Sequence, residues 1–124
     1  MISPRACQRT IQAMLREIDT CDAYRGQGTR RSFAADTLRR DGCEICLERL
    51  VALAEQLRAA APRLHGRLEP VLLPLSGLAG RSLNRMDSDV LWSLADYCRE
   101  ELRPALRLVA ALLPRSIKSG GQPG

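Results

Sequence analysis

The feature that most restricts the fold is a long segment, residues 37–61, in which apolar side chains recur every three or four residues. Two apolar stripes overlap there: one comprises Cys43, Leu47, Leu50, Ala54 and Leu57, the other Cys46, Leu50, Leu53 and Leu57. A helix that is apolar over more than half of its circumference must be covered on more than one side. We therefore expect residues 37–61 to form the central helix of the fold, with part of its surface facing another subunit.

Two further long helices are predicted from the same periodicity. The first begins at Ser3-Pro4, a helix-capping residue followed by a proline suited to the first helical position, and runs to about Tyr24. The second spans about 87–113 and contains Pro104, which removes one backbone hydrogen bond and should bend it.

The remaining connections are short or interrupted. A glycine-containing segment, residues 26–29, ends the first helix and leads into a short helical turn at 32–36. A helical segment at about 65–78 contains Pro70 and Pro74, and because a proline ends or kinks a helix we expect short or bent pieces there.

Composition agrees with an all-α fold. Aromatic residues make up only 3% of the chain, and leucine, alanine and arginine, all good helix formers, dominate it. We predict an up-down bundle of about four main helices in one domain, residues 1–114. A polar, glycine-rich tail, residues 115–124, is expected to be disordered.

The chain is basic, with a net charge of +5, and 18 of its 19 basic residues are arginine. Arginine donates paired hydrogen bonds to phosphate, which makes RNA a candidate partner. The arginines placed to form a phosphate-binding rim are Arg30, Arg31, Arg39, Arg40, Arg81 and Arg85. The alternative is an ordinary solvated helix face, on which Glu44 and Glu48 pair with these arginines at four-residue spacing.

The cysteines and the single histidine offer little chemistry. Cys43 and Cys46 form a C-x-x-C motif, but it lies inside a predicted helix, without a preceding strand or a second ligand pair. Packing in the core is the favoured interpretation, with a metal site or a disulfide as the alternative. His65 follows a helix break and is expected to be exposed. We predict no cofactor and no metal.

No segment has the length and apolarity of a membrane span or of a signal peptide. We therefore expect a cytoplasmic protein without membrane contact, in which the cysteines remain reduced.

Two segments resemble the HepT-like family of HEPN helical bundles. Arg40-Asp41 opens "RRDGCEICLERLVALAEQL", which is similar to a long helix of that family, and Asp87 and Trp92 follow at intervals similar to the family pattern. Members of the family are toxins or partner subunits encoded beside minimal nucleotidyltransferases in toxin–antitoxin pairs. The resemblance implies a homodimeric bundle and a nucleotidyltransferase-type partner protein.

The family's functional motif is an arginine followed by a histidine and, two residues later, a tyrosine. Aligned through Asp87 and Trp92, these positions hold Ser76, Arg81 and Leu83. An arginine stays charged at neutral pH and is no general base, and leucine has no hydroxyl to accept a nucleotide. The motif is therefore degenerate. A formal Arg-x6-His match does occur at Arg58 and His65, but it lies well upstream of the family position and has no tyrosine.

The resemblance favours an inactive binding or interaction subunit that pairs with a nucleotidyltransferase or contacts RNA, with Arg39, Arg40, Arg81 and Arg85 as binding residues. One alternative is an active, metal-independent ribonuclease toxin with a rearranged site, using His65 or Arg81 with Arg85. Another is the substrate-binding helical domain of a two-chain nucleotidyltransferase.

Overall fold

The structure is a computed structural model that describes residues 4–76 and 87–113. The elements in these ranges are α1 (Pro4–Arg25), α2 (Arg30–Ala34), α3 (Thr37–Ala60), α4 (Pro62–Ser76), α5 (Ser88–Tyr97), the π-helical turn η1 (Cys98–Leu102) and α6 (Arg103–Leu112). Neither range contains a strand, and neither contains a helix long and apolar enough to cross a membrane.

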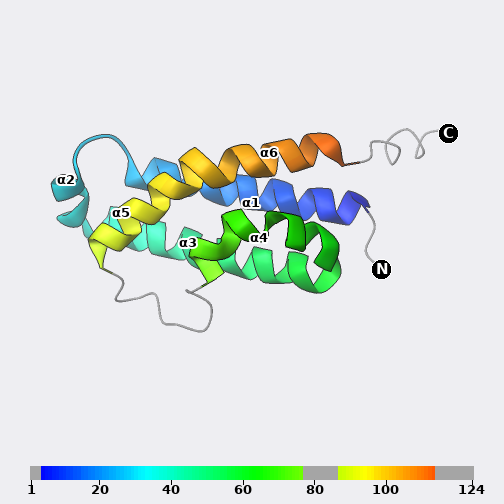
Figure 1. Ribbon diagram of the computed structural model, residues 1–124. Coiled ribbons are helices and arrows are strands. Elements are labelled where there is room, and N and C mark those ends of the chain that lie inside the picture. Colours follow the sequence, from blue (N-terminus) through cyan, green and yellow to red (C-terminus); the bar gives the residue numbers. More distant parts are fainter. Residues whose placement is uncertain (1–3, 77–86, 114–124) are drawn as a thin grey trace.

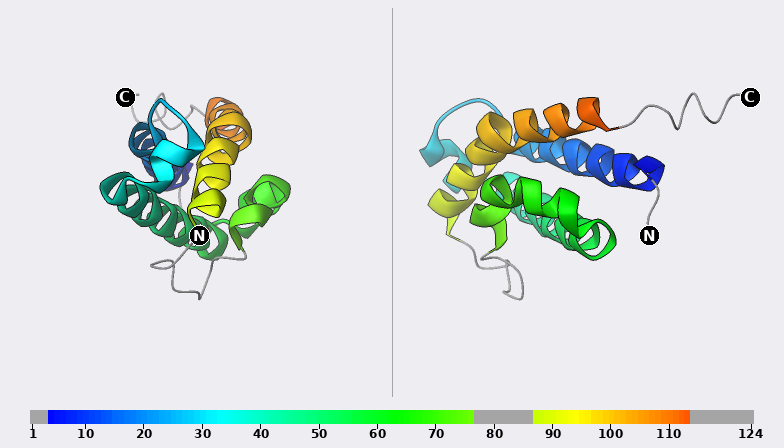
Figure 2. Two further views of the ribbon diagram at one scale, coloured as in Figure 1. Left: turned by 90° about the vertical axis from the view of Figure 1, so that its left-hand side faces the viewer. Right: turned by 45° about the vertical axis from the view of Figure 1, so that its right-hand side comes forward.

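The helices pack into a bundle in which successive long helices run in alternating directions (Figure 1). The antiparallel pair α1 and α3 forms one side of the bundle, and α4 and the continuous rod α5–η1–α6 form the other (Figure 2). The short α2 closes the end at which α3 and α5 begin (Figure 1). The predicted all-α bundle is thus confirmed for the described residues.

Polar caps fix the corner around α2. The Thr29 side chain accepts a hydrogen bond from the Ser32 backbone, and the Ser32 hydroxyl accepts one from the Thr29 backbone, so the two form a capping box. Asp36 then caps α3 by accepting a hydrogen bond from the Arg39 backbone N–H at 3.2 Å. These caps explain why a helix of five residues lies between two long ones.

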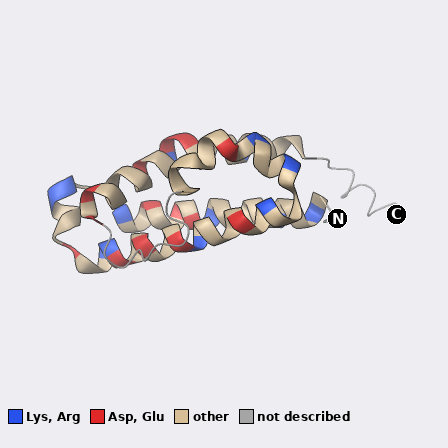
Figure 3. Ribbon diagram, turned by 60° about the horizontal axis from the view of Figure 1, so that its bottom comes forward, with Lys and Arg blue, Asp and Glu red and all other residues tan. Residues whose placement is uncertain are grey.

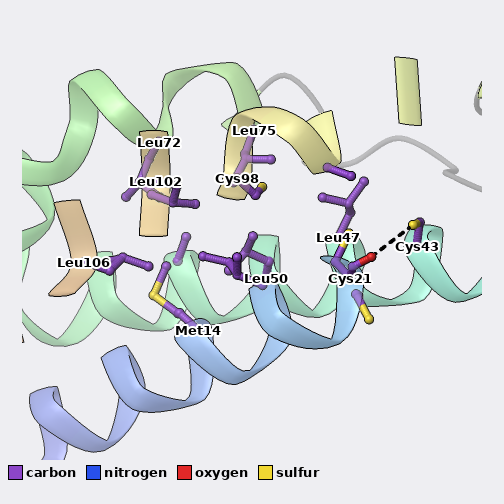
Figure 4. Close-up of a cluster of buried hydrophobic side chains, with 14 of the residues drawn as sticks. Met14, Cys21, Cys43, Leu47, Leu50, Leu72, Leu75, Cys98, Leu102 and Leu106 are labelled. Carbon is purple, nitrogen blue, oxygen red and sulfur yellow. Dashed lines mark hydrogen bonds between the residues drawn. The ribbon is translucent and has the colours of Figure 1, made fainter. Parts of the chain in front are cut away.

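The core is built from the apolar stripes that the sequence shows. Side chains of α1, α3, α4 and the α5–η1–α6 rod converge between the two sides of the bundle (Figure 4). The fully buried large residues include Ile11, Met14, Ile18, Leu47, Leu50, Leu57, Leu75, Leu91, Leu102 and Leu106. Leu47, Leu50 and Leu57 of α3 are at most 1% exposed, so the predicted apolar stripe faces the core, while the opposite face of the helix is exposed.

The prediction that the two prolines of α4 break this segment into short pieces was wrong. The helix continues through Pro70 and Pro74, because both lie on its exposed side together with Gly66. The prolines leave the carbonyls of Gly66 and Pro70 without helical partners, but water can reach this side of the helix. The core residues Leu68, Leu72 and Leu75 lie on the opposite face and are undisturbed.

Pro104 is accommodated by a wider helical turn. The Arg103 N–H donates to the Cys98 carbonyl, five residues back, and Cys98–Leu102 forms a π-helical turn. The rod changes direction here, so the predicted bend is present (Figure 1). The wider turn supplies the adjustment that a proline inside a helix requires.

Candidate functional site

The described ends of α4 and α5 flank the region to which the sequence assigns the family motif. Ser76 is the last residue of α4, and its hydroxyl donates to the Leu73 carbonyl at 2.8 Å. Asp87 precedes α5, and its side chain accepts a hydrogen bond from the Asp89 N–H at 2.7 Å. Arg81, Leu83 and Arg85 lie outside the described residues, so Ser76 is the only motif position that the structure places.

Trp92 fixes the beginning of α5 against the rest of the bundle. Its ring is 8% exposed and packs against Phe33 of α2, with the ring centroids 5.5 Å apart. The Arg25 guanidinium lies 3.8 Å above the Trp92 ring. Arg25 Nε also lies 2.7 Å from Asp96 Oδ1 on α5. The tryptophan on which the resemblance rests is therefore a packing residue.

Arg39 holds the end of α1. Its Nε donates to the Tyr24 carbonyl at 3.1 Å, and its Nη2 donates to the carbonyls of Arg25 and Gln27. Carbonyls at the end of a helix have no helical partners, and a cation there is also favoured by the helix dipole. The chain reaches this geometry through Gly26, whose φ of 65° is in the left-handed region. The donors of this predicted binding residue are thus engaged within the chain.

The other arginines of the predicted rim differ from one another in their surroundings. Arg40 is half-buried and donates to the Thr37 hydroxyl at 3.3 Å. Arg30 is exposed and lies 3.8 Å from Asp89 across the junction of α2 and α5. Arg31 is exposed beside it. The structure therefore gathers Arg30, Arg31, Arg39 and Arg40 at one end of the bundle, where Arg30 and Arg31 are exposed and Arg39 and Arg40 are half-buried.

Glu44 was expected on a solvated face, but it is only 6% exposed. It lines a hollow of about 370 Å³ with Asp41, Ile45 and Glu48. Burial raises the pKa of Glu44, and the negative charges of Asp41 and Glu48 raise it further. The sequence does not reveal this burial, because Glu44 lies at the edge of the apolar stripe of α3.

A second hollow, of about 220 Å³, lies between α3 and α4. Its lining brings His65 and Glu69 of α4 together with Arg58 and Glu55 of α3 and with Ser76. Arg58 is bound to its own helix, since its Nε and Nη2 both donate to Glu55 Oε1, at 3.0 and 2.7 Å. The two residues of the formal Arg-x6-His match thus line one groove, in which the Arg58 guanidinium is paired with Glu55.

The cysteines are core residues. All five are free and buried, and Cys43 and Cys46 are at most 2% exposed, which confirms the packing interpretation of the C-x-x-C motif. The Cys43 thiol donates to the Cys21 carbonyl at 3.5 Å (Figure 4). Burial raises the pKa of Cys46 and of Cys98 to about 12, so the reactive thiolate form is disfavoured. Within residues 4–76 and 87–113, no three histidine, cysteine or acidic side chains are grouped to hold a metal ion.

An ion-pair network that the sequence did not predict joins α1 to the rod. Arg99 bridges Asp22 and Asp96, with both contacts at 3.3 Å. Arg103 lies 2.9 Å from Asp19 and 3.6 Å from Asp22. The three-residue spacing of the aspartates and the four-residue spacing of the arginines are the only signals that could have indicated it.

The chain matches no family model, and comparisons with curated proteins and with solved structures gave no significant match. The family assignment therefore depends on the residues quoted from the sequence.

Proposed function

We propose that the chain is a HepT-like helical-bundle protein of a toxin–antitoxin type system, acting as a catalytically inactive binding or interaction subunit. Its partner would be a nucleotidyltransferase-type protein or RNA, and the subunit itself a homodimer in the cytoplasm. The loss of activity follows from the degenerate motif, because Ser76, Arg81 and Leu83 supply neither a general base nor a hydroxyl in the family arrangement.

The observation that supports the family assignment best is the position of its landmark residues in the bundle. Arg40 and Asp41 lie near the beginning of α3, and Asp87 caps α5. Trp92, one turn into α5, is buried against α2. The beginnings of α3 and α5 lie at the same end of the bundle (Figure 1). These residues, distant in the sequence, thus lie at one end of the bundle, and this supports the proposal.

Co-expression tests the partner role. The chain is produced together with the product of the adjacent gene, which the proposal expects to be a minimal nucleotidyltransferase, and any complex is isolated by affinity purification and gel filtration. A stable complex is expected. A nucleotidyltransferase that elutes alone, with the chain folded and in excess, would contradict the partner role.

A ribonuclease with a rearranged site is the second candidate, because His65 and Arg58 line one groove. Its test is RNA degradation by the purified chain, compared with His65→Ala and Arg58→Ala, and with Arg63→Ala as an exposed control on the same helix. The inactive subunit is expected to leave RNA intact in every case. Degradation that disappears only in the His65→Ala and Arg58→Ala variants would replace the proposed function with this one.

A further inference from the structure

The hollow around Glu44, on the exposed side of α3, is lined mainly by carboxyl groups. Among residues 4–76 and 87–113, Glu44 is the one charged residue that is buried, with 6% of its surface exposed. It lines the hollow of about 370 Å³ together with Asp41, Ile45 and Glu48, which are all exposed. The four residues lie within about two turns of one helix. Seen from below the bundle of Figure 1, acidic positions recur along this helix (Figure 3).

The Glu44 side chain has no partner within the described part of the chain. There, no hydrogen bond or ion pair involves the side chain of Asp41, Glu44 or Glu48. The charge of Arg40 acts on Glu44 from a distance, but the Arg40 guanidinium donates to the Thr37 hydroxyl instead. An ionised carboxylate that is buried without a cation destabilises the folded chain, so a cation that enters the hollow is bound favourably.

The lining of the hollow selects the kind of cation. Its negative charge repels phosphate, so nucleic acid does not fit there. Within residues 4–76 and 87–113, no group of three acidic, cysteine or histidine side chains could hold a metal ion. A guanidinium group instead spreads five N–H donors over a plane, which lets it reach several carboxylates at once. It is also less strongly hydrated than an ammonium group, which favours its entry into a partly buried site.

We propose that this hollow is a binding site for an alkylguanidinium cation, which pairs with Glu44 and is held at the rim by Asp41 and Glu48. Ile45, which is 47% exposed, lies beside them to contact the alkyl chain. The volume is at the lower end of the range for small-molecule sites, roughly 300–1,000 Å³, and suits a group of this size. The site goes beyond the proposed function, because it uses none of the motif positions and requires neither a nucleotidyltransferase nor RNA.

The test is an NMR titration of the ¹⁵N-labelled full chain with butylguanidinium at neutral pH and low salt. The backbone amide signals of residues 41–48 are expected to shift and to saturate, with a Kd on the order of 1 mM for a ligand of this size. Butylammonium should bind more weakly, because it lacks the planar fork of donors. Butylurea has nearly the same shape without the charge and should not bind.

Two variants remove the carboxylates. Glu44→Gln keeps the shape of the buried side chain without its charge and should weaken binding at least about tenfold. Asp41→Asn/Glu48→Gln removes the exposed carboxylates and should weaken it about two- to fivefold, since exposed ion pairs contribute less. The matched control is Glu101→Gln, which neutralises an exposed carboxylate on η1 and should leave the Kd unchanged. The amide spectra show whether each variant is folded.

A peptide distinguishes the two sources of such a cation. A blocked Gly-Arg-Gly peptide presents the guanidinium group as a partner protein does. If it binds at least as tightly as butylguanidinium, the site receives an arginine side chain of a protein. If the peptide binds more weakly, the hollow excludes a peptide backbone and receives a small guanidino compound.

Three results would overturn the inference. The first is the absence of saturable shifts at residues 41–48 with butylguanidinium far above the expected Kd. The second is an equal Kd for the original chain and a folded Glu44→Gln variant. The third is binding of butylurea as tight as that of butylguanidinium, because the carboxylates would then contribute nothing to recognition.

Discussion

Replacing Arg39 by alanine tests whether this arginine is a structural clamp or a ligand-binding residue. The change removes the donors that satisfy the carbonyls of Tyr24, Arg25 and Gln27 at the end of α1. A hydrogen bond from a charged donor contributes about 1.5–3 kcal/mol when it is well shielded. Two of the three bonds are exposed to water, so each of these contributes less. We estimate a loss of about 3 kcal/mol in the free energy of unfolding, including about 0.5 kcal/mol from the helix dipole.

The assay is urea unfolding followed by circular dichroism, with thermal melting as a second measurement. A loss of about 3 kcal/mol corresponds to a decrease in Tm of about 10–15 °C for a domain of this size. Arg40→Ala is the matched control, since among the described residues the Arg40 side chain donates one hydrogen bond, to the Thr37 hydroxyl at 3.3 Å, and the substitution should cost about 1 kcal/mol or less. Arg39→Lys should fall between them, because an ammonium group cannot reproduce the planar fork.

The structural assignment would be refuted if Arg39→Ala lost no more stability than Arg40→Ala. An Arg39→Ala variant of unchanged stability that no longer bound RNA would instead identify Arg39 as a binding residue.

Three further predictions concern the core and its edges. Ala at Gly42 places a Cβ 2.3 Å from the Tyr24 ring, whereas Gly66 has open space around it. In urea unfolding, Gly42→Ala should therefore lower the free energy of unfolding by about 1–3 kcal/mol, and Gly66→Ala should raise it by about 0.5–1 kcal/mol. Equal effects of the two substitutions would contradict the packing described. Because burial raises the pKa of Glu44, the folded state holds this proton more tightly than the unfolded state, so stability should fall as pH rises through its normal pKa and beyond. Glu44→Gln should accordingly be more stable than the original chain at pH 7, and this gain should vanish well below the normal pKa of glutamate, where the Glu44 carboxyl is neutral in the folded and the unfolded state. A stability gain that does not depend on pH would exclude this cause. The five buried thiols should react with a thiol reagent such as DTNB only on unfolding, and rapid labelling of Cys46 or Cys98 in the native protein would contradict their raised pKa values.

The long helices could be predicted because their apolar periodicity is uninterrupted. The first was expected to end at about Tyr24 and ends at Arg25, and the central helix, expected over 37–61, ends at Ala60. The course of α4 could not be predicted in the same way. Whether a proline breaks a helix depends on whether water can reach the carbonyl that it leaves unpaired, and exposure is a property of the assembled bundle.

The candidate site was harder to predict because the sequence gives residue types and not their partners. Arg39 and Arg40 are adjacent and look alike in the sequence, yet one clamps the end of α1 and the other does not. Glu44 and Glu48 are one turn apart, and only Glu44 is buried. For the arginines the distinction arises from where α1 ends against α3, a tertiary contact that no local pattern encodes.

The π-helical turn at Cys98–Leu102 has a consequence for the rotational phase of the rod. Cys98, Leu102 and Leu106 are each four residues apart and all fully buried, although a regular α-helix would turn each successive side chain about 40° away from the last. The extra residue in the wide turn absorbs this drift. A one-residue deletion among Arg99, Glu100 and Glu101 that restored a regular turn would place Cys98 and Leu106 seven residues apart, and seven residues bring a regular helix back to within about 20° of the same face. Leu106 would then stay in the core, whereas the full-length rod keeps it there only because the turn is wide, so this one turn determines which side of α6 is buried.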